Sequence, residues 1–518
     1  MTFVSNLGLA FEEVAARHPD RTALFYPEAQ ESVSYAHLAT LAKAIAVELH
    51  QRGLQQGDVV VLFHDKSPHA YAAMLACLRL GVTYANLDPD SPWARLEKIL
   101  HTCRPRLLIN SFTALPHAGA LEQIGDLPVL DLPALSPTPV EHPEAMPEAG
   151  RVSGGRPAYI MFTSGSTGVP KGAAISHANL LWFIAWAHDR FGITQNDVIT
   201  NANPMYFDNS VFDFYVTLFA GATLVPLSAA QVREPRVLVG LVNEARCSVW
   251  FSVPSLLVYL LTTRALKAED FPAMRSIIFG GEGFPKTRLK QLFDLFGHRA
   301  ALENVYGPTE CTCICSAHRV TASDFDDMQK LTTLGLIAQN FTAHILPLDM
   351  ANPDFGELLL AGPQVGSGYY NDPDRTARSF IQNPANSIYP EVGYRTGDLV
   401  ERDKDGRLHF RGRQDFQIKH MGYRIELEEI EAALNTLPDV RECAVVYNKI
   451  SEGLGEIVAF TSVGAAVPAD ALVAQLAALL PAYMVPRKVN LMEHLPKNAN
   501  GKIDRVYLQS IINARQPV

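Results

Sequence analysis

One short stretch of the sequence places hydroxyls, glycines and a lysine where they could bind a phosphorylated ligand. In FTSGSTGVPKG, apolar residues over 158–162 predict a strand, and the loop after it supplies Thr163, Ser164, Gly165, Ser166, Thr167, Gly168 and Lys171. Backbone N–H groups and hydroxyls of such a loop can surround phosphate oxygens, and the lysine adds positive charge. It is not a Walker-type loop, because Pro170 precedes Lys171 and Gly172 follows it. A polar turn without a ligand stays the alternative for this stretch taken alone.

Five more motifs follow, and with the first they carry a family resemblance. They read FDNSVFDFYVTLFAGATLV, NVYGPTE, YRTGDL, GRQDFQIKHMGYRIELEEIE and PKNANGKIDR. In order and separation the six motifs resemble the adenylate-forming enzymes: peptide-synthetase adenylation domains, acyl-CoA synthetases and luciferases. The resemblance covers nearly the whole chain. It implies an α/β fold with a large N-terminal AMP-binding domain over residues 1–413, made of two α/β subdomains and a β-rich one, and a small mobile α+β C-terminal domain over residues 414–518.

The resemblance implies a first reaction in which a carboxylate attacks the α-phosphorus of ATP and expels pyrophosphate. Both reactants are anionic, so positioning and charge neutralisation must supply most of the catalysis. The implied catalytic residues are Thr163, Glu310 and Lys502, and Lys502 would bridge the substrate carboxylate and the α-phosphate. Glu310 matches the family's Mg²⁺ ligand, and a carboxylate suits that hard cation.

The other implied nucleotide contacts come from the middle of the chain. Tyr306 offers a flat face for adenine, although a lone aromatic at a turn could equally be part of the core. Asp398 could accept both ribose hydroxyls, with a turn aspartate as the alternative. The rest of the set is Gly281, Glu282, Asn304, Val305, Gly307, Thr309 and Arg413, together with the loop above and Lys502. Glu282 stands where many relatives have Ser or Ala.

Asp208, in YFDNSVF, indicates the substrate class. It matches an aspartate that amino-acid-activating members keep for the substrate ammonium, and a buried carboxylate is costly unless it meets a cation. A helix N-cap is the alternative, because aspartate favours that position and the following residues predict a helix. The other implied substrate-binding positions are Asn209, Phe212, Phe251, Ile278, Gly280, Val305, Cys313 and Ile314.

These side chains are apolar apart from Asn209, and Gly280 is expected to open room between two phenylalanines. The pattern resembles pockets for isoleucine or valine, so we expect a small or medium aliphatic amino acid. A D-alanine or β-amino acid carrier protein ligase stays an alternative, although D-alanine ligases typically carry cysteine at the place of Gly280. An acyl-CoA synthetase is the other enzyme alternative, and a scaffold protein without activity is the non-enzyme one. Apolar pockets separate neighbouring aliphatic residues poorly, because one methylene contributes only about 1–3 kcal/mol.

In the implied second reaction, the aminoacyl group passes to the phosphopantetheine thiol of a separate carrier protein. The C-terminal domain would rotate near Gln414 and Asp415, bring residues 417–423 to the site and remove Lys502. Gly422 would let pantetheine pass close to the backbone. No carrier domain follows the last motif, so we expect a stand-alone enzyme.

The elements that must position these residues alternate between strands and helices. Buried strands are predicted over 59–64, 105–110, 247–254 and 275–281, with helices between them, as in parallel α/β sheets. Residues 331–399 predict a smaller β-rich unit, and ELEEIEAALNTL predicts an amphipathic helix. CTCIC, over 311–315, alternates like a buried strand beside the pocket and lacks the spacing of a zinc site.

Composition narrows the class of protein. The chain of 518 residues is too long for one core, and 48% hydrophobic with 19% charged residues is typical of a folded globular protein. A net charge of -10 argues against nucleic-acid binding. The sequence offers no apolar run of membrane-spanning length and no signal-peptide pattern at its start, and its seven cysteines suit a reducing compartment. We therefore expect a cytoplasmic enzyme with no membrane partner.

Overall fold

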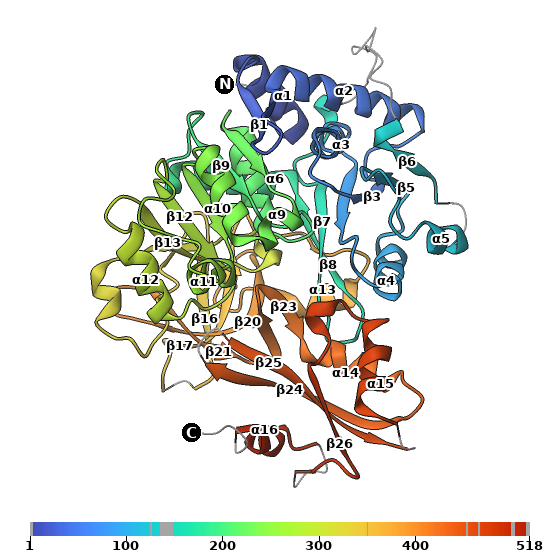
Figure 1. The fold of residues 1–518 in the computed structure, drawn as a ribbon, viewed down its shortest axis with the longest axis vertical. Helices are drawn as coiled ribbons and strands as arrows, with labels where there is room; N and C mark the ends of the chain where they lie inside the picture. The colour runs from blue at the N-terminus through green and yellow to red at the C-terminus, as the bar shows by residue number, and fades with distance from the viewer. Residues whose placement is uncertain are drawn as a thin grey trace.

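A computed structural model describes residues 4–124, 127–134, 149–349, 351–451, 454–464, 467–498 and 503–513. Two large sheets flanked by helices form the bulk of the N-terminal part, and the C-terminal residues pack below them (Figure 1). None of the helices in these ranges is long and apolar enough to cross a membrane. The α/β fold class expected from the sequence is confirmed.

The first large sheet has seven strands in the order β18-β8-β7-β4-β3-β5-β6. Its centre is parallel, and β3 is buried along its whole length, which explains the continuous apolar run VVVLF. The strands are β3 (Val59–Phe63), β4 (Thr83–Leu87), β5 (Leu107–Asn110), β6 (Val129–Asp131), β7 (Pro157–Thr163), β8 (Lys171–Ser176) and β18 (Gly368–Tyr369).

The second large sheet has nine strands in the order β15-β14-β13-β12-β11-β9-β10-β1-β2. They are β1 (Thr22–Tyr26), β2 (Glu31–Ser34), β9 (Val198–Asn201), β10 (Thr223–Pro226), β11 (Val249–Ser252), β12 (Ser276–Gly280), β13 (Ala301–Tyr306), β14 (Ser316–Arg319) and β15 (Leu336–Ile337). The strands predicted around 59–64, 105–110, 247–254 and 275–281 are thereby confirmed as β3, β5, β11 and β12, each within one or two residues at either end.

Helices cover these sheets, and several of them begin at a residue whose side chain caps the helix. Ser67 accepts a bond from Ala70 N at the start of α3, Pro68 occupies the first turn, and Gly81 ends the helix in a left-handed conformation. The helices of this part are α1 (Leu7–Arg17), α2 (Tyr35–Gln51), α3 (Pro68–Leu80), α4 (Trp93–Cys103), α5 (Ala118–Leu121), α6 (His177–Phe191), α7 (Asn209–Val211), α8 (Thr217–Phe219), α9 (Ala229–Arg233), α10 (Pro235–Glu244), α11 (Pro254–Thr262) and α12 (Lys286–Phe296), with a π-helical turn over Phe212–Val216. Short 3₁₀ turns lie at Glu122–Ile124, Leu132–Ala134, Ala149–Arg151, Thr309–Cys311 and Ala322–Phe325.

A smaller antiparallel sheet follows, as the alternation over 331–399 predicted. Along β20 nearly every second residue is buried, which is the pattern of a strand with one covered face. Its elements are β16 (Thr342–Pro347), β17 (Phe355–Ala361), β19 (Phe380–Gln382), β20 (Val392–Arg402) and β21 (Leu408–Arg413), with helix α13 (Pro373–Ser379).

The C-terminal residues form a hairpin and an α+β unit. The hairpin is β22 (Gln417–His420) with β23 (Tyr423–Glu426), and the second sheet has the order β24-β25-β26. The remaining elements are α14 (Leu427–Asn435), β24 (Val440–Ser451), β25 (Leu454–Val463), α15 (Ala469–Ala477), a 3₁₀ turn at Ala482–Met484, β26 (Lys488–Met492) and α16 (Arg505–Asn513). In Figure 1 β23 and α14 approach the two large sheets from below.

Candidate functional site

The predicted phosphate loop is the turn of a β-hairpin. Thr163 at the end of β7 pairs with Lys171 at the start of β8, so the loop lies between two antiparallel strands. A Cβ atom on Gly165 would lie 2.1 Å from Val169 O, so this turn requires glycine. Thr163 Oγ1 is buried and has no hydrogen-bond partner among the described residues. A ligand oxygen could satisfy that hydroxyl.

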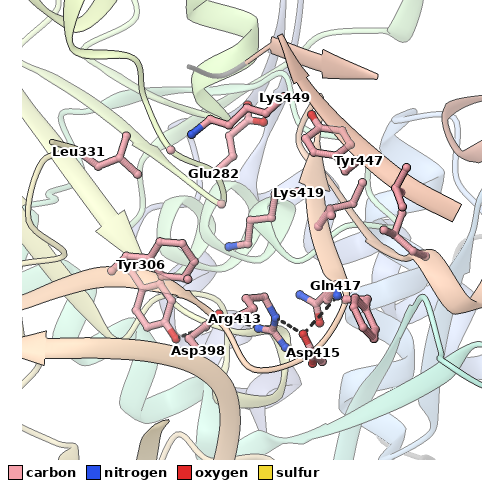
Figure 2. A pocket seen from close by; sticks show the side chains of 18 of the residues that line it. Glu282, Tyr306, Leu331, Asp398, Arg413, Asp415, Gln417, Lys419, Tyr447 and Lys449 are labelled. Carbon is pink, nitrogen blue, oxygen red and sulfur yellow. Dashed lines mark hydrogen bonds and ion pairs between the residues drawn. The ribbon is translucent and has the colours of Figure 1, made fainter. Parts of the chain in front are cut away.

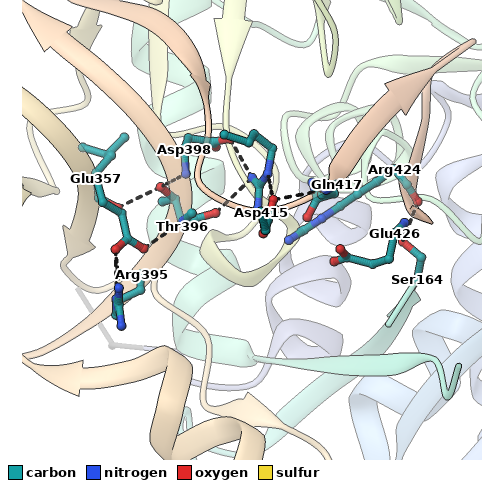
Figure 3. A network of polar contacts seen from close by, with 12 residues as sticks. Ser164, Glu357, Arg395, Thr396, Asp398, Asp415, Gln417, Arg424 and Glu426 are labelled. Carbon is teal, nitrogen blue, oxygen red and sulfur yellow. Dashed lines mark hydrogen bonds and ion pairs between the residues drawn. The ribbon is translucent and has the colours of Figure 1, made fainter. Parts of the chain in front are cut away.

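Residues of the C-terminal part bond to the donors of this loop. Ser164 Oγ donates to Arg424 O at 2.7 Å, a pair visible in Figure 3. Gly165 N donates to Glu429 Oε2 at 3.0 Å, and Lys171 Nζ donates to Glu426 Oε1 at 3.3 Å. Burial lowers the pKa of Lys171, with the Arg424 charge acting in the same direction. Carboxylates therefore take the positions at which the sequence predicts phosphate oxygens.

Glu310 lies at the centre of a cluster of charges. Its side chain is fully buried, Arg424 Nη1 donates to Oε2 at 2.8 Å, and Tyr369 Oη donates to Oε1 at 2.7 Å. Burial alone would raise the pKa of Glu310, but the charges of Arg424 and Lys171 hold it well below its ordinary value. Both carboxylate oxygens are engaged, so in this arrangement Glu310 does not fit a magnesium ion. Arg424 supplies the positive charge instead.

Tyr306, Asp398 and Arg413 form a connected set on one wall of a large cavity. Tyr306 Oη donates to Asp398 Oδ2 at 2.5 Å, and Arg413 Nη1 donates to Asp398 Oδ1 at 2.6 Å. Figure 2 shows the three side chains together at the bottom of the cavity, which has a volume of about 830 Å³. Asp398 is held in place because its backbone N–H donates to Thr396 Oγ1, while Glu357 accepts the neighbouring Gly397 N–H (Figure 3).

The other predicted adenosine contacts surround this cavity. Asn304 Nδ2 donates to Thr333 O at 2.8 Å, so the side-chain oxygen is the atom left to accept an adenine amino group. The cavity wall also contains Gly281, Glu282 and Val305. Gly307 and Thr309 line the adjoining smaller cavity instead.

The smaller cavity, of about 60 Å³, contains seven of the nine predicted substrate-binding residues. They are Asp208, Asn209, Phe251, Gly280, Val305, Cys313 and Ile314. Phe212 and Ile278 are fully buried behind this wall, and the Phe212 ring packs edge-on against Phe251 with centroids 5.1 Å apart.

Asp208 points toward this small cavity and does not cap a helix. It stands directly before α7, but its side chain makes no capping hydrogen bond. Thr309 Oγ1 donates to Asp208 Oδ2 at 2.5 Å. Burial raises the pKa of Asp208, against the effects of Thr309 and of the Arg424 and Lys419 charges. A cation in the cavity would relieve that cost, so the geometry favours recognition over capping.

Two expectations about the pocket wall are wrong. Gly280 does not open room: a Cβ atom there would lie 2.5 Å from Val305 O, because β12 and β13 pair at this position. The segment Cys311–Cys315 is not a strand, since Thr312 and Cys313 have φ values of 57° and 73°. Its three thiols are buried, but they line an irregular turn between Thr309–Cys311 and β14. The alternation of cysteines with other residues in CTCIC suggested a strand, but such an alternation carries no information about left-handed backbone conformations.

The hairpin β22–β23 reaches the site, as predicted for residues 417–423. Gln417, Lys419, Gly422 and Arg424 line the small cavity beside Asp208. Lys419 Nζ lies 5.9 Å from the centroid of the Tyr306 ring, and burial lowers the pKa of Lys419. Lys502 lies outside the described residues.

Sequence reasoning did not single out Lys419, Arg424, Glu426 or Glu429. They stand in a motif from which the sequence predicted only that residues 417–423 reach the site and that Gly422 lies close to pantetheine, with no role for these charged side chains. A signal was available in GYRIELEEIE, where many charged residues accompany the apolar positions of a predicted helix. Such a pattern indicates charged side chains close to a buried surface.

Comparisons with known proteins show what the chain resembles. The model of the family described as AMP-binding enzyme matches residues 11–370, and that of the AMP-binding enzyme C-terminal domain matches residues 429–502. The chain is 34% identical to an L-proline–[L-prolyl-carrier protein] ligase of Pseudomonas fluorescens, covering 95% of this chain and 96% of the relative. It is 30% identical to a D-alanine–D-alanyl carrier protein ligase of Lacticaseibacillus rhamnosus, covering 98% and 100%.

A solved structure gives the same result for the fold. An NRPS protein containing adenylation and PCP domains, bound to a vinylsulfonamide inhibitor, superposes with a TM-score of 0.83 at 26% identity. The match covers 97% of this chain and 84% of that chain.

Proposed function

Because the chain belongs to the AMP-binding enzyme family, we propose that it activates a small or medium aliphatic amino acid with ATP and transfers the aminoacyl group to a separate carrier protein. In the first step a carboxylate oxygen bonds to the α-phosphorus and the bond to pyrophosphate breaks, giving an aminoacyl adenylate. In the second step the phosphopantetheine thiol loses its proton, sulfur bonds to the carbonyl carbon, and AMP leaves. The product is a thioester.

The observation that carries this proposal is Asp208 in the small cavity. Its carboxylate faces a space whose other walls include Phe251, Val305 and Ile314. A substrate ammonium would pair with the carboxylate, and an aliphatic side chain would bury against the apolar wall. An acid without an amino group would leave the buried charge unpaired.

The hairpin supports the second reaction. Lys419 lies over the Tyr306 ring and within electrostatic range of Asp398 and Asp208, so its ammonium could stabilise the phosphate of AMP as that group leaves. The first reaction would use Lys502 in another position of the C-terminal part. Mg²⁺ is expected to accompany ATP, because it binds through one or two carboxylates plus phosphate oxygens. Glu310 could serve it only after Arg424 has moved away.

The alternative functions differ in the carboxylic acid that is activated and in the thiol that accepts it. A D-alanine or β-amino acid carrier protein ligase would use the same Asp208. L-proline is a further candidate because two relatives are named for it. An acyl-CoA synthetase would need neither an ammonium nor Asp208.

The test is amino-acid-dependent exchange of labelled pyrophosphate into ATP. The panel contains both enantiomers of alanine, valine, leucine, isoleucine and proline, several β-amino acids, and fatty and aromatic acids. Exchange with one aliphatic amino acid is the expected result. Exchange only with acids that lack an amino group would reject the proposal in favour of the coenzyme A branch.

A further inference from the structure

Glu282 joins the adenine side of the site to the hairpin. Its Oε1 accepts the backbone N–H of Ser255 at 2.6 Å, and its Oε2 accepts the backbone N–H of Gly422 at 2.9 Å. Ser255 lies in the first turn of α11, where an anion is favoured by the unpaired N–H groups and the helix dipole. One carboxylate thus bridges a fixed element of the N-terminal part and the tip of β22–β23.

The hairpin tip needs such an anchor. His420 pairs with Tyr423, so Met421 and Gly422 form a two-residue turn, and their φ values of 52° and 84° are those of a type I′ turn. Met421 is a non-glycine residue in the left-handed region, a conformation that surrounding contacts must stabilise. The turn ladder does not use the N–H of Gly422. Glu282 supplies its acceptor.

The turn at Gly422 also packs closely against Val253. A Cβ atom on Gly422 would lie 2.9 Å from a methyl carbon of Val253, so the turn passes directly over the residue before α11. Glu282 therefore sets how closely the hairpin approaches the cavity that contains Asp208 and Lys419.

We infer that Glu282 is a positioning residue for the transfer step, in addition to lining the adenine side of the cavity. It fixes the backbone at Gly422 and thereby the placement of Lys419 on the same hairpin. The inference rests on the proposed function, because transfer to a thiol is the step that the docked hairpin would serve. It predicts that a change at Glu282 lowers the rate of transfer more than it lowers the rate of adenylate formation.

The test compares Glu282→Gln with the wild-type enzyme in two reactions and one structural measurement. Glutamine keeps the size of the side chain but has one acceptor oxygen, so it can satisfy only one of the two N–H groups. The reactions are pyrophosphate exchange, with an amino acid that supports it, and single-turnover transfer to free pantetheine. The structural measurement is hydrogen–deuterium exchange of the peptide covering 417–426 without nucleotide. The matched control is Glu269→Gln, which removes the same charge from an exposed loop residue.

The expected result is transfer slowed by about tenfold, a clearly smaller loss of exchange, and faster deuterium uptake over 417–426 in Glu282→Gln only. Unchanged transfer and unchanged uptake would overturn the inference. An equal loss of both reactions would also overturn it, because it would place Glu282 in nucleotide binding. If no amino acid supports exchange in the wild type, the proposed function fails while the deuterium measurement still decides whether Glu282 anchors the hairpin.

Discussion

The ion pair between Arg95 and Glu429 gives the sharpest prediction about how the two parts of the chain dock. Glu429 Oε1 bonds to Arg95 Nη1, and the side chains are only 3% and 8% exposed. Its other oxygen accepts Gly165 N, in the phosphate loop. The substitution Glu429→Gln keeps an acceptor for Gly165 but leaves the guanidinium of Arg95 buried without its directly paired carboxylate.

The expected magnitude follows from that burial. Leaving one partner of a buried ion pair uncompensated costs about 3–5 kcal/mol. Residue 95 lies in α4 and residue 429 in α14, so the cost falls on docking of the C-terminal part and not on folding of either part alone. Since about 1.4 kcal/mol corresponds to a factor of ten, the docking equilibrium should weaken by about 100-fold or more. Transfer, which would need the docked state, should slow accordingly.

The assay measures both half-reactions on the same preparations. Transfer to pantetheine is followed in a single turnover, and pyrophosphate exchange reports adenylate formation. The rate of pyrophosphate exchange should stay the same or increase. When the C-terminal part is docked less often, Gly165 and Lys171 are free to bind phosphates for more of the time. Glu428→Gln, the same charge change at the next residue, is the control, and Arg95→Met with Glu429→Gln should recover part of the lost transfer. Undiminished transfer, or a parallel loss of exchange, would refute the reasoning.

Three further predictions concern the site itself. Asp208→Asn should lower amino-acid-dependent exchange by about 100-fold, because the substrate ammonium loses its partner. Burial raises the pKa of Asp208, so the folded state holds its proton more tightly than the unfolded state, and this group favours folding increasingly as pH falls. Asp208→Asn should therefore raise the denaturation midpoint at neutral pH, and a lower midpoint would point to a structural role. Gly280→Ala should lower the free energy of unfolding by about 1–3 kcal/mol, because its Cβ would lie 2.5 Å from Val305 O. Denaturant titration measures this change, and an unchanged midpoint would contradict that packing. Lys502→Ala should abolish exchange while ATP binding, measured by calorimetry, persists, and full exchange would remove the residue from the mechanism.

The motifs predicted most of the scaffold because they report local properties. A buried apolar run such as Val59–Phe63 favours a strand wherever it occurs, and the loop after residue 162 needs glycine and hydroxyls regardless of its neighbours. The same local patterns failed at Cys311–Cys315, where left-handed residues interrupt the alternation, and at Gly280, whose role depends on the strand beside it. The domain boundary after residue 413 and the mobility of the C-terminal part stay predictions.

By itself the sequence determined the family, and it predicted the nucleotide loop and an aspartate suited to an ammonium. Each of these follows from residue types at short spacing, which fix local backbone geometry and chemical class. Only the tertiary structure decided that Glu426 and Glu429 occupy the phosphate loop, that Arg424 neutralises Glu310, and that Glu282 holds the hairpin tip. Gly165 and Glu429 are 264 residues apart, and no local pattern encodes which of many distant carboxylates will meet a given N–H group. That pairing depends on how the C-terminal part docks, which is the sum of many contacts made only in the folded chain.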